Sequence, residues 1–479
     1  MRVTFSAFDW AVVCIYFASV VFVGFRAARK SRGPIDEYLV AGRSLTLPVF
    51  VATLVSTWYG GILGVGEFSY RFGISNWFVF GAPYYFFAIL FAIFLAPRVH
   101  KAKLHTIPDK LRETYGDRTA MMGSFLTLFI VTPAPYVLMV GIIVEMLFGW
   151  SLTLSVIFAT AASVAYLYSG GLHSDVRTNT LEFILMYIGF GVALPFCFAE
   201  YGGLGFLKTH LPPGHLTLTG GNSWQYIIAW FFIASWTLID PAFHQRCYAA
   251  KSEKVARNGI FVSIIFWFCF DFMTSTTGLY ARALNPNLTQ PAMSYPALAE
   301  LVLPDFVKGL FYVGMLATIM SSLESLTFIS AVTIGKDILH RLLPDRRTPD
   351  PHKRILKYSQ IGILITALIS IAIALFIPSV ITIWYDLGTV FVPGLLIPLV
   401  TSYYPRIRAP NGYVFLSMTS GWMTSLVWLA SGLVHSGILA PAYPFGIQPM
   451  YPGLAISLFF YSLGIFKKRK GTDRVSTVR

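Results

Sequence analysis

Val55-Ser-Thr-Trp-Tyr-Gly-Gly61 and Trp236-Thr-Leu-Ile-Asp-Pro241 each interrupt a long apolar run near its middle. A pair of glycines weakens a helix, and proline removes one of its hydrogen bonds. Backbone groups opened in this way at membrane depth survive only where protein buries them or where they line a cavity. Two interrupted helices at matching positions in a chain indicate the binding site of an inverted-repeat transporter. The sequence therefore predicts a ligand site between these two breaks.

The chain as a whole is apolar enough to be embedded in a membrane. Of its 479 residues, 56% are hydrophobic and 12% are charged, about half the charged share of a typical soluble protein. A helix needs roughly 20 apolar residues to cross a bilayer. Thirteen runs are of that order, at 8–28, 48–71, 75–97, 121–148, 151–171, 178–200, 224–245, 258–283, 306–335, 357–377, 380–404, 412–434 and 447–466. This composition excludes a water-soluble enzyme and a disordered chain.

Lysine and arginine are distributed unevenly between the loops. Of the 36 basic residues, 31 follow odd-numbered runs or lie in the tail. Because short cytoplasmic loops carry the excess of Lys and Arg, we predict a plasma (inner) membrane protein with its N-terminus outside and its C-terminus cytoplasmic. The same bias accounts for the net charge of +14 without a nucleic-acid partner. Five tryptophans at the predicted outer ends are interpreted as an interfacial belt: Trp10, Trp77, Trp150, Trp224 and Trp384.

The two breaks also predict the internal organisation. Residues 48–200 and 224–404 would form a first and a second five-helix repeat, each with the break in its first helix. Residues 1–28 and 405–466 would be peripheral helices, and 467–479 a cytoplasmic tail. Residues 1–479 are thus expected to form a single transmembrane transporter domain.

Four sequence motifs match a known family. They are Asp36-Glu-Tyr-Leu-Val-Ala-Gly-Arg43, Gly64-Val-Gly66 with Tyr70 and Gly73, His105-Thr-Ile-Pro-Asp109 with Tyr115-Gly116, and Gln245-Arg246 with Ala249-Ala-Lys-Ser252. Together they resemble the sodium:solute symporter family, which includes sodium/proline and sodium/sugar cotransporters. The resemblance covers nearly the whole chain. It implies an all-α membrane protein of the leucine-transporter type, a five-plus-five inverted repeat with about 13 transmembrane helices, and alternating-access uptake of a small organic solute with Na+ as the coupling ion.

The resemblance further implies a main sodium site between the second and ninth runs. The ligands it carries over are the hydroxyls of Ser321 and Ser322 and the carbonyl oxygens of Leu54, Thr57 and Thr318. Positions 318, 321 and 322 share one helical face by their spacing. The alternative is that the two serines bond back to their own helix or pack against a neighbour. No cofactor and no transition metal are expected.

A candidate second cation site follows from a departure from the family pattern. Relatives with an additional sodium site carry Thr-Asp…Gln in the sixth run, where this chain has Thr178-Asn179…Glu182. They also carry a small or hydroxyl residue where this chain has Glu324, next to Ser325. We hypothesise that Glu324 replaces the missing carboxylate, faces Asn179 with Glu182 nearby, and holds a second sodium or a proton. The alternative is an ion pair between Glu324 and a basic residue at the cytoplasmic end.

The predicted solute site lies between the two breaks, with a contribution from the eleventh run. Its candidates are Trp58, Tyr59, Gly60, Gly61, Trp236, Thr237, Asp240, Tyr385 and Asp386. Sugar carriers of the family have long polar side chains where Gly60 and Gly61 stand, which disfavours a sugar, although two glycines leave room for a bulkier solute. Asp240 and Asp386 can meet an ammonium group, and no Lys or Arg lies deep in any run. We expect an amino acid, an amine or another polar metabolite.

Several alternatives compete with this interpretation. Trp58 and Trp236 can be packing residues, Asp240 can cap the broken backbone, and Asp271 can be a structural hydrogen-bonding group. A proton-coupled carrier of the same fold, with Glu324 or Asp240 as the relay, is the alternative function. An integral-membrane enzyme is a more distant alternative, because the nine histidines show no HExxH spacing. A sensor would need a signalling domain, which the 13 residues after the last run cannot hold. The expected partners are the solute, Na+ and the lipid bilayer.

Overall fold

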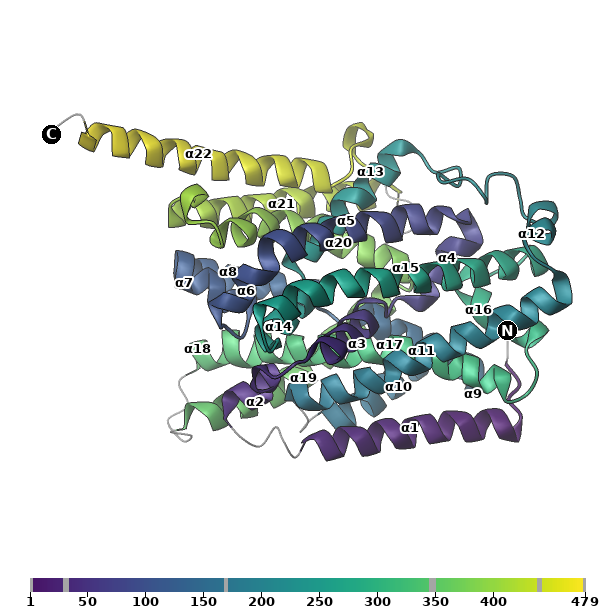
Figure 1. Cartoon of the computed structure of the whole chain (residues 1–479). Helices are drawn as coiled ribbons and strands as arrows, with labels where there is room; N and C mark the ends of the chain where they lie inside the picture. Colours follow the sequence, from purple (N-terminus) through teal and green to yellow (C-terminus); the bar gives the residue numbers. More distant parts are fainter. Residues whose placement is uncertain (1–2, 29–33, 168–170, 344–349, 437–441, 477–479) are drawn as a thin grey trace.

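The computed structural model describes residues 3–28, 34–167, 171–343, 350–436 and 442–476, and these fold into long helices that lie side by side (Figure 1). By length and composition, ten of the described helical segments can cross a membrane, or eleven if one bent pair counts as a span. The prediction of an all-α membrane protein is confirmed. The count of thirteen spans stays a prediction.

The first part of the described chain carries the predicted first repeat. Its helices are α1 (Ala7–Ala28), α2 (Ile35–Val40), η2 (Ala41–Arg43), α3 (Leu47–Trp58), α4 (Ile62–Phe72), η3 (Trp77–Gly81), α5 (Ala82–Leu90), η4 (Phe91–Leu95), α6 (Ala96–Ala102), α7 (Ile107–Tyr115), α8 (Asp117–Ile130), α9 (Ala134–Phe148), α10 (Leu152–Leu167), α11 (Gly171–Tyr201) and α12 (Leu204–His210). The segments η3, α5, η4 and α6 follow one another without a gap, so they form one continuous helical rod.

The second part carries the predicted second repeat and the last helices. These are α13 (Trp224–Ile233), η5 (Ala234–Ile239), α14 (Pro241–Ala249), α15 (Glu253–Leu284), η6 (Pro291–Met293), α16 (Ser294–Val302), α17 (Val307–Val332), η7 (Thr333–Leu339), α18 (His340–Leu342), α19 (Pro351–Phe376), α20 (Val380–Ser402), η8 (Pro405–Ile407), α21 (Asn411–Ser436), η9 (Pro444–Gly446) and α22 (Met450–Ser476). In Figure 1, α21 and α22 lie together at one edge of the bundle.

Both breaks expected from the sequence are present. α3 ends at Trp58 and α4 begins at Ile62, with a bend of 59° between them. The other break lies between η5 and α14, where the carboxylate of Asp240 accepts hydrogen bonds from the backbone N–H groups of Ala242 at 2.7 Å and Phe243 at 3.3 Å. Asp240 is therefore the N-cap of α14 and accepts from two N–H groups of the first turn that have no partner within the helix, while Pro241, at the first helical position, has no N–H to satisfy.

A third break was not expected. The run 121–148 was predicted as one span, and Asp117–Phe148 is indeed one candidate span, but within it α8 ends at Ile130 and α9 begins at Ala134. Pro133 and Pro135 account for the interruption, because neither can donate a helix hydrogen bond. The freed carbonyl of Val131 accepts a hydrogen bond from the Ser330 hydroxyl of α17 at 2.9 Å. The third break therefore faces the same central helix as the first.

That central helix is α17, which runs through the interior of the bundle (Figure 1). In the most apolar window of Val307–Leu342, 94% of the residues are buried, against 33% for α1. A Cβ on Gly314 of α17 would lie 2.7 Å from the Cα of Gly189 in α11. The two backbones therefore approach as closely as small residues permit in membrane helix pairs.

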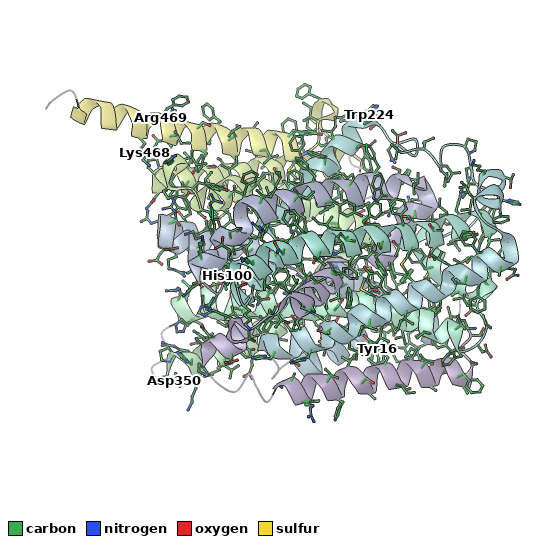
Figure 2. The ribbon with its side chains drawn as sticks, in the orientation of Figure 1. Tyr16, His100, Trp224, Asp350, Lys468 and Arg469 are labelled. Atoms are coloured by element: carbon green, nitrogen blue, oxygen red, sulfur yellow. The ribbon has the colours of Figure 1, made fainter. Side chains whose placement is uncertain are left out.

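The two ends of the described chain lie at opposite ends of the bundle (Figure 1), as an odd number of spans requires. Lys468 and Arg469 mark one end, on the same side as His100 and Asp350, and Trp224 lies toward the other (Figure 2). Which end faces the cytoplasm stays the prediction made from the distribution of Lys and Arg.

Candidate functional site

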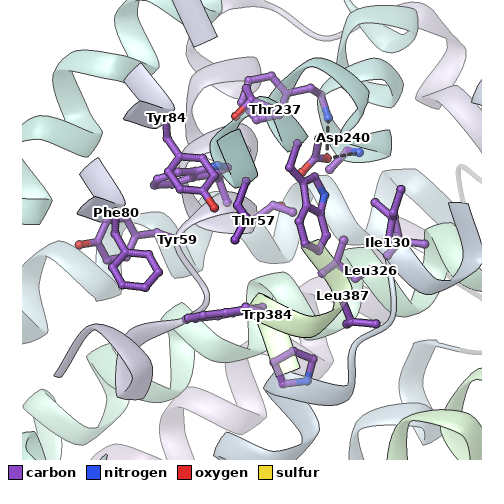
Figure 3. Close-up of a pocket in the computed structure, with 18 of the residues that line it drawn as sticks. Thr57, Tyr59, Phe80, Tyr84, Ile130, Thr237, Asp240, Leu326, Trp384 and Leu387 are labelled. Atoms are coloured by element: carbon purple, nitrogen blue, oxygen red, sulfur yellow. Dashed lines mark hydrogen bonds between the residues drawn. The ribbon is translucent and has the colours of Figure 1, made fainter. Parts of the chain in front are cut away.

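A cavity of about 130 Å³ lies where the three breaks meet (Figure 3). Each break contributes residues to its wall. The first contributes Trp58, Tyr59 and Gly61, the second Trp236, Thr237 and Asp240, and the third Val131, Thr132, Pro135 and Tyr136. Broken helices thus surround an interior cavity, which is the setting in which open backbone is tolerated at membrane depth.

The cavity brings together most of the predicted solute-site residues. Six of the nine line it, namely Trp58, Tyr59, Gly61, Trp236, Thr237 and Asp240. The other three, Gly60, Tyr385 and Asp386, are not among the described residues that line the cavity. The Tyr385 hydroxyl instead donates to the side-chain oxygen of Gln448. The contribution expected from the eleventh run thus comes from its other residues, Trp384 and Leu387.

Protein atoms fill the space beside the two glycines. A Cβ on Gly61 would lie 1.8 Å from the Trp384 ring, and a Cβ on Gly60 would lie 2.0 Å from the Ser322 hydroxyl oxygen. The expectation that these glycines leave room for a bulkier solute was therefore wrong. They are required because the broken segment packs directly against α17 and α20.

Trp384 was also misinterpreted as an interfacial anchor. It lies near the start of α20, lines the cavity, and has its ring centroid 6.5 Å from that of Tyr136 and 6.4 Å from that of Phe80. Hydropathy locates the end of a span but does not distinguish a ring that faces lipid from one that faces an internal cavity.

The serines predicted for the main sodium site face the C-terminal end of α3. The Ser321 hydroxyl lies 2.9 Å from the carbonyl oxygen of Ser56 and 3.0 Å from that of Thr318. The Ser322 hydroxyl donates to the carbonyl of Thr57. All of these residues are buried. Leu54, one turn earlier in α3, is buried as well and lines the cavity.

This contact concentrates oxygen atoms at a helix end. The last carbonyls of a helix lack partners within it and carry the negative end of its dipole. Here two hydroxyls of α17 and three carbonyls meet between α3 and α17, with no water-exposed residue among them. Such a set of oxygen atoms is the kind of environment that a hard cation prefers.

A buried arginine stands next to this oxygen cluster. Nη2 of Arg246 lies 2.9 Å from the Thr57 hydroxyl, 2.8 Å from the Ser325 hydroxyl and 2.9 Å from a carboxylate oxygen of Asp175. The Asn179 amide donates to the hydroxyls of Thr57 at 3.2 Å and Ser325 at 3.0 Å. Of the residues of the predicted second cation site, Ser325 therefore contacts the guanidinium group directly, and Asn179 contacts the same two hydroxyls as Arg246.

The position of Arg246 corrects an expectation from the sequence. No Lys or Arg was expected deep in a span, yet Arg246 is fully buried. The reason is the second break, after which all nine residues of α14 are buried inside the bundle. A residue counted as a loop residue therefore reaches the core.

The other two residues of the predicted second site form a separate pair of carboxylates. Glu182 of α11 accepts a hydrogen bond from the Tyr16 hydroxyl at 2.9 Å, and Glu324 of α17 accepts one from the Thr178 hydroxyl at 2.9 Å. Both glutamates are buried, and their charges lie close enough to interact. The four predicted residues thus fall into two groups, one around Arg246 and one around Glu182 and Glu324.

Asp271 connects the first break to α15. Its carboxylate accepts hydrogen bonds from the hydroxyls of Tyr59, at 2.5 Å, and Tyr85. This agrees with its interpretation as a structural hydrogen-bonding group. The same residue lines the cavity, so its carboxyl group also contributes to the wall that a ligand would meet.

The Asp36–Arg43 motif joins segments near one end of the bundle. Arg43 donates to the carbonyls of Tyr248 at 3.1 Å and Lys103 at 3.0 Å, and its side chain pairs with Asp36 at 3.3 Å. Partial burial by itself raises the pKa of Asp36, but hydrogen bonding to His105 and the charges of His105 and Arg43 outweigh it, so this pKa lies below its usual value. The motif therefore ties η2 to the end of α14.

Sequence reasoning missed several aromatic residues of the cavity wall. These are Phe80, Tyr84, Tyr136, Trp230, Phe243 and Trp384. The paired prolines at 133 and 135 were a usable signal for Tyr136, because they mark a third broken helix. Phe243 follows the second break by two residues, so that break was a usable signal for it as well. For the others, no local pattern separates a cavity residue from a packing residue.

The chain was compared with known proteins. The model of the family described as "Sodium:solute symporter family" matches residues 38–404. The sodium/glucose cotransporter 4 of Danio rerio is 27% identical over 402 residues, which cover 72% of this chain and 59% of that protein. The sodium/proline symporter of Staphylococcus aureus (strain JH9) is 23% identical over 496 residues, which cover 96% of this chain and 93% of that protein. The chain thus spans less than two thirds of the first relative and nearly all of the second.

Solved structures show the same architecture. The substrate-bound, outward-open structure of a Na+-coupled sialic acid symporter superposes with a TM-score of 0.77 at 15% identity, covering 96% of this chain and 98% of that one. A likeness of this kind shows the fold and not the ligand. The expected leucine-transporter-type fold is confirmed.

Proposed function

This chain belongs to the sodium:solute symporter family, and on that premise we propose that it takes up a small organic solute together with sodium by alternating access. The family and the relatives are symporters, so an enzymatic role is set aside. The single observation that supports the proposal most strongly is the contact of the Ser321 and Ser322 hydroxyls with the carbonyl end of α3, directly beside the cavity.

We propose that sodium is held by Ser321, Ser322, Thr318, Thr57 and Leu54. Thr57 supports a direct link between ion and solute, because its carbonyl accepts from Ser322 while the residue itself lines the cavity. A cation that orders the segment 54–61 lowers the cost of ordering it for the solute, and by linkage the solute strengthens binding of the cation.

The energy available from one sodium ion is sufficient for uptake. Moving one charge inward across 100 mV supplies about 2.3 kcal/mol, and a tenfold sodium gradient adds about 1.4 kcal/mol. Together these support an accumulation of several hundredfold. We propose that 48–200 and 224–404 are the two inverted repeats, that one moves against the other around the cavity, and that the protein acts in the plasma membrane with its tail in the cytoplasm.

Ser321→Ala and Ser322→Ala test the sodium site. Each is expected to weaken equilibrium binding of ²²Na+ to the purified protein by about tenfold or more, because a hydrogen-bonding or ligand contact to a charge contributes roughly 1.5–3 kcal/mol. Ser263→Ala is the matched control, since this buried serine donates only within α15, to the carbonyl of Gly259 at 2.8 Å. Unchanged sodium affinity in both α17 variants would refute the site.

We propose that Glu182 and Glu324 form the second cation site, holding a proton or a second sodium. Two carboxylates buried near each other repel one another, and a cation or proton that they share reduces this repulsion. Glu324→Gln is expected to reduce the Hill coefficient for sodium to 1 if the site holds a second sodium, and to remove the pH dependence of sodium binding if it holds a proton. Glu300→Gln, which removes a carboxylate that contacts Thr4 and Lys308 away from the cavity, is the control. A binding curve that Glu324→Gln leaves as in the wild type would rule out this second site.

The proton-coupled alternative rests on the same pair of carboxylates. It predicts that a pH gradient drives solute uptake into vesicles that contain the protein when sodium is absent. Sodium-coupled symport predicts no accumulation under that condition.

A further inference from the structure

The charged groups of the cavity wall are all acidic. Among the described residues that line it, Asp240 and Asp271 have acidic side chains, and none is Lys, Arg or His. Arg246 interacts with Asp240 at longer range, but its guanidinium is in direct contact with Asp175. Asp240 is only half-buried, so its carboxylate remains accessible from the cavity while it caps α14. The wall therefore favours a cation over an anion.

Aromatic rings form much of the remaining wall. They come from every broken segment and from two further helices, and they include Trp58, Tyr84, Tyr136, Trp236 and Trp384. Trp58 and Tyr84 stand edge to face with their centroids 5.3 Å apart. Figure 3 shows Tyr84, Trp384 and Asp240 on different sides of the open centre. Ring faces attract cations, and aromatic cages recognise methylated ammonium groups.

The size of the cavity and one hydroxyl without a partner among the described residues limit the range of possible ligands further. An engineered cavity of about 150 Å³ holds benzene, so about 130 Å³ suits a solute of roughly six to eight non-hydrogen atoms. The Thr237 hydroxyl lines this space, is 2% exposed, and has no hydrogen-bond partner among the described residues. Because a buried hydroxyl without a partner is costly, it is available to an oxygen atom of the solute.

We propose that the solute is a small N-methylated ammonium compound that carries a hydroxyl group, held by the ring faces, Asp240 and the Thr237 hydroxyl. The inference rests on the proposed function, since it names the substrate class of the same cavity. A methylated ammonium donates no N–H hydrogen bonds, so ring faces suit it better than they suit a primary amine. A carboxylate on the solute would meet no basic side chain in the described wall.

Two analogues of choline, one neutral and one zwitterionic, test this proposal without altering the protein. Binding of tritiated choline to the purified full-length chain is measured in sodium, with displacement by choline, by its neutral isostere 3,3-dimethylbutan-1-ol, and by the zwitterion glycine betaine. Choline is expected to bind saturably. The neutral isostere is expected to compete at least about tenfold more weakly, because it lacks a cation–π attraction that exceeds 1.4 kcal/mol across several rings. Glycine betaine keeps the trimethylammonium group, but its carboxylate would meet acidic and no basic side chains in the described wall, so it too is expected to compete at least about tenfold more weakly.

Two variants test which side chains contact the ammonium group and the hydroxyl group of the solute. Asp240→Asn keeps a good N-cap but removes the charge, so it should weaken choline at least about tenfold and leave the neutral isostere unchanged. Asp350→Asn is the control, because Asp350 caps α19 in the same way but lies outside the cavity wall. Thr237→Val should weaken choline roughly three- to tenfold and leave tetramethylammonium, which lacks a hydroxyl, unaffected.

The result that overturns the inference is one of three: no choline binding in sodium, equal competition by the neutral isostere, or tighter competition by glycine betaine. If ²²Na+ binding in the same preparation is saturable and sensitive to Ser322→Ala, the proposed function stands even then. If choline binds but sodium does not, the inference stands and sodium coupling fails.

Discussion

Gly60→Ala is expected to weaken sodium binding by about a hundredfold. Its Cβ would lie 2.0 Å from the Ser322 hydroxyl oxygen, 2.2 Å from the Ser322 Cβ and 2.5 Å from the ring of Tyr136. Contacts this short force the broken segment away from α17, because the helix backbone on the far side cannot yield. Both Ser322 and the carbonyl of Thr57 then leave their positions, and losing two contacts to a charge costs about 3 kcal/mol or more, which corresponds to that factor.

Equilibrium ²²Na+ binding measures this effect directly. Gly412→Ala is the control, because a Cβ on Gly412, at the start of α21, would meet no atom of another segment within 4 Å. The control should bind sodium as the wild type does. Sodium affinity within a factor of two of the wild type in Gly60→Ala would mean that α3 and α17 do not share a cation.

The breaks were predictable because their cause is local. A glycine pair and a proline disturb the helix at their own positions, and α3 ends at Trp58 while α14 begins at Pro241, as the quoted stretches indicate. The contact between α3 and α17 was predictable only from the family resemblance. Hydroxyls spaced i, i+3 and i+4 define a helical face, but nothing local states which helix that face meets.

The errors share one cause, which is that the direction of a side chain depends on distant segments. Arg246 looked like a loop residue because it follows a run, yet the break at Asp240 places α14 inside the bundle. Trp384 looked like an anchor because it opens a run, yet its ring packs on Gly61. A basic or aromatic residue that follows a broken helix segment or packs against one therefore cannot be assigned by hydropathy alone.

Thr57 contacts the proposed sodium site, the buried Arg246 and the cavity at the same time. Its carbonyl accepts from Ser322, its hydroxyl lies 2.9 Å from Arg246, and it lines the cavity. Arg246 in turn contacts Asp175 of α11 and Ser325 of α17. We therefore expect a movement of α14 to affect the same residue that we propose as a sodium ligand. The buried ion pair between Arg246 and Asp175 is the rigid part of this connection.

Arg246→Gln is accordingly expected to destabilise the protein by about 3–5 kcal/mol, since it leaves Asp175 buried without its counter-charge. Thermal unfolding of the purified protein measures the loss. The double variant Arg246→Gln/Asp175→Asn should recover most of it, because no unpaired charge then remains and both amides can hydrogen-bond to Ser325 and Asn179. Arg257→Gln, which removes an exposed arginine of α15, is the control and should change little. If the double variant is as unstable as the sum of the two single variants, the charges of Arg246 and Asp175 are not coupled, and the connection from α14 to Thr57 does not depend on this ion pair.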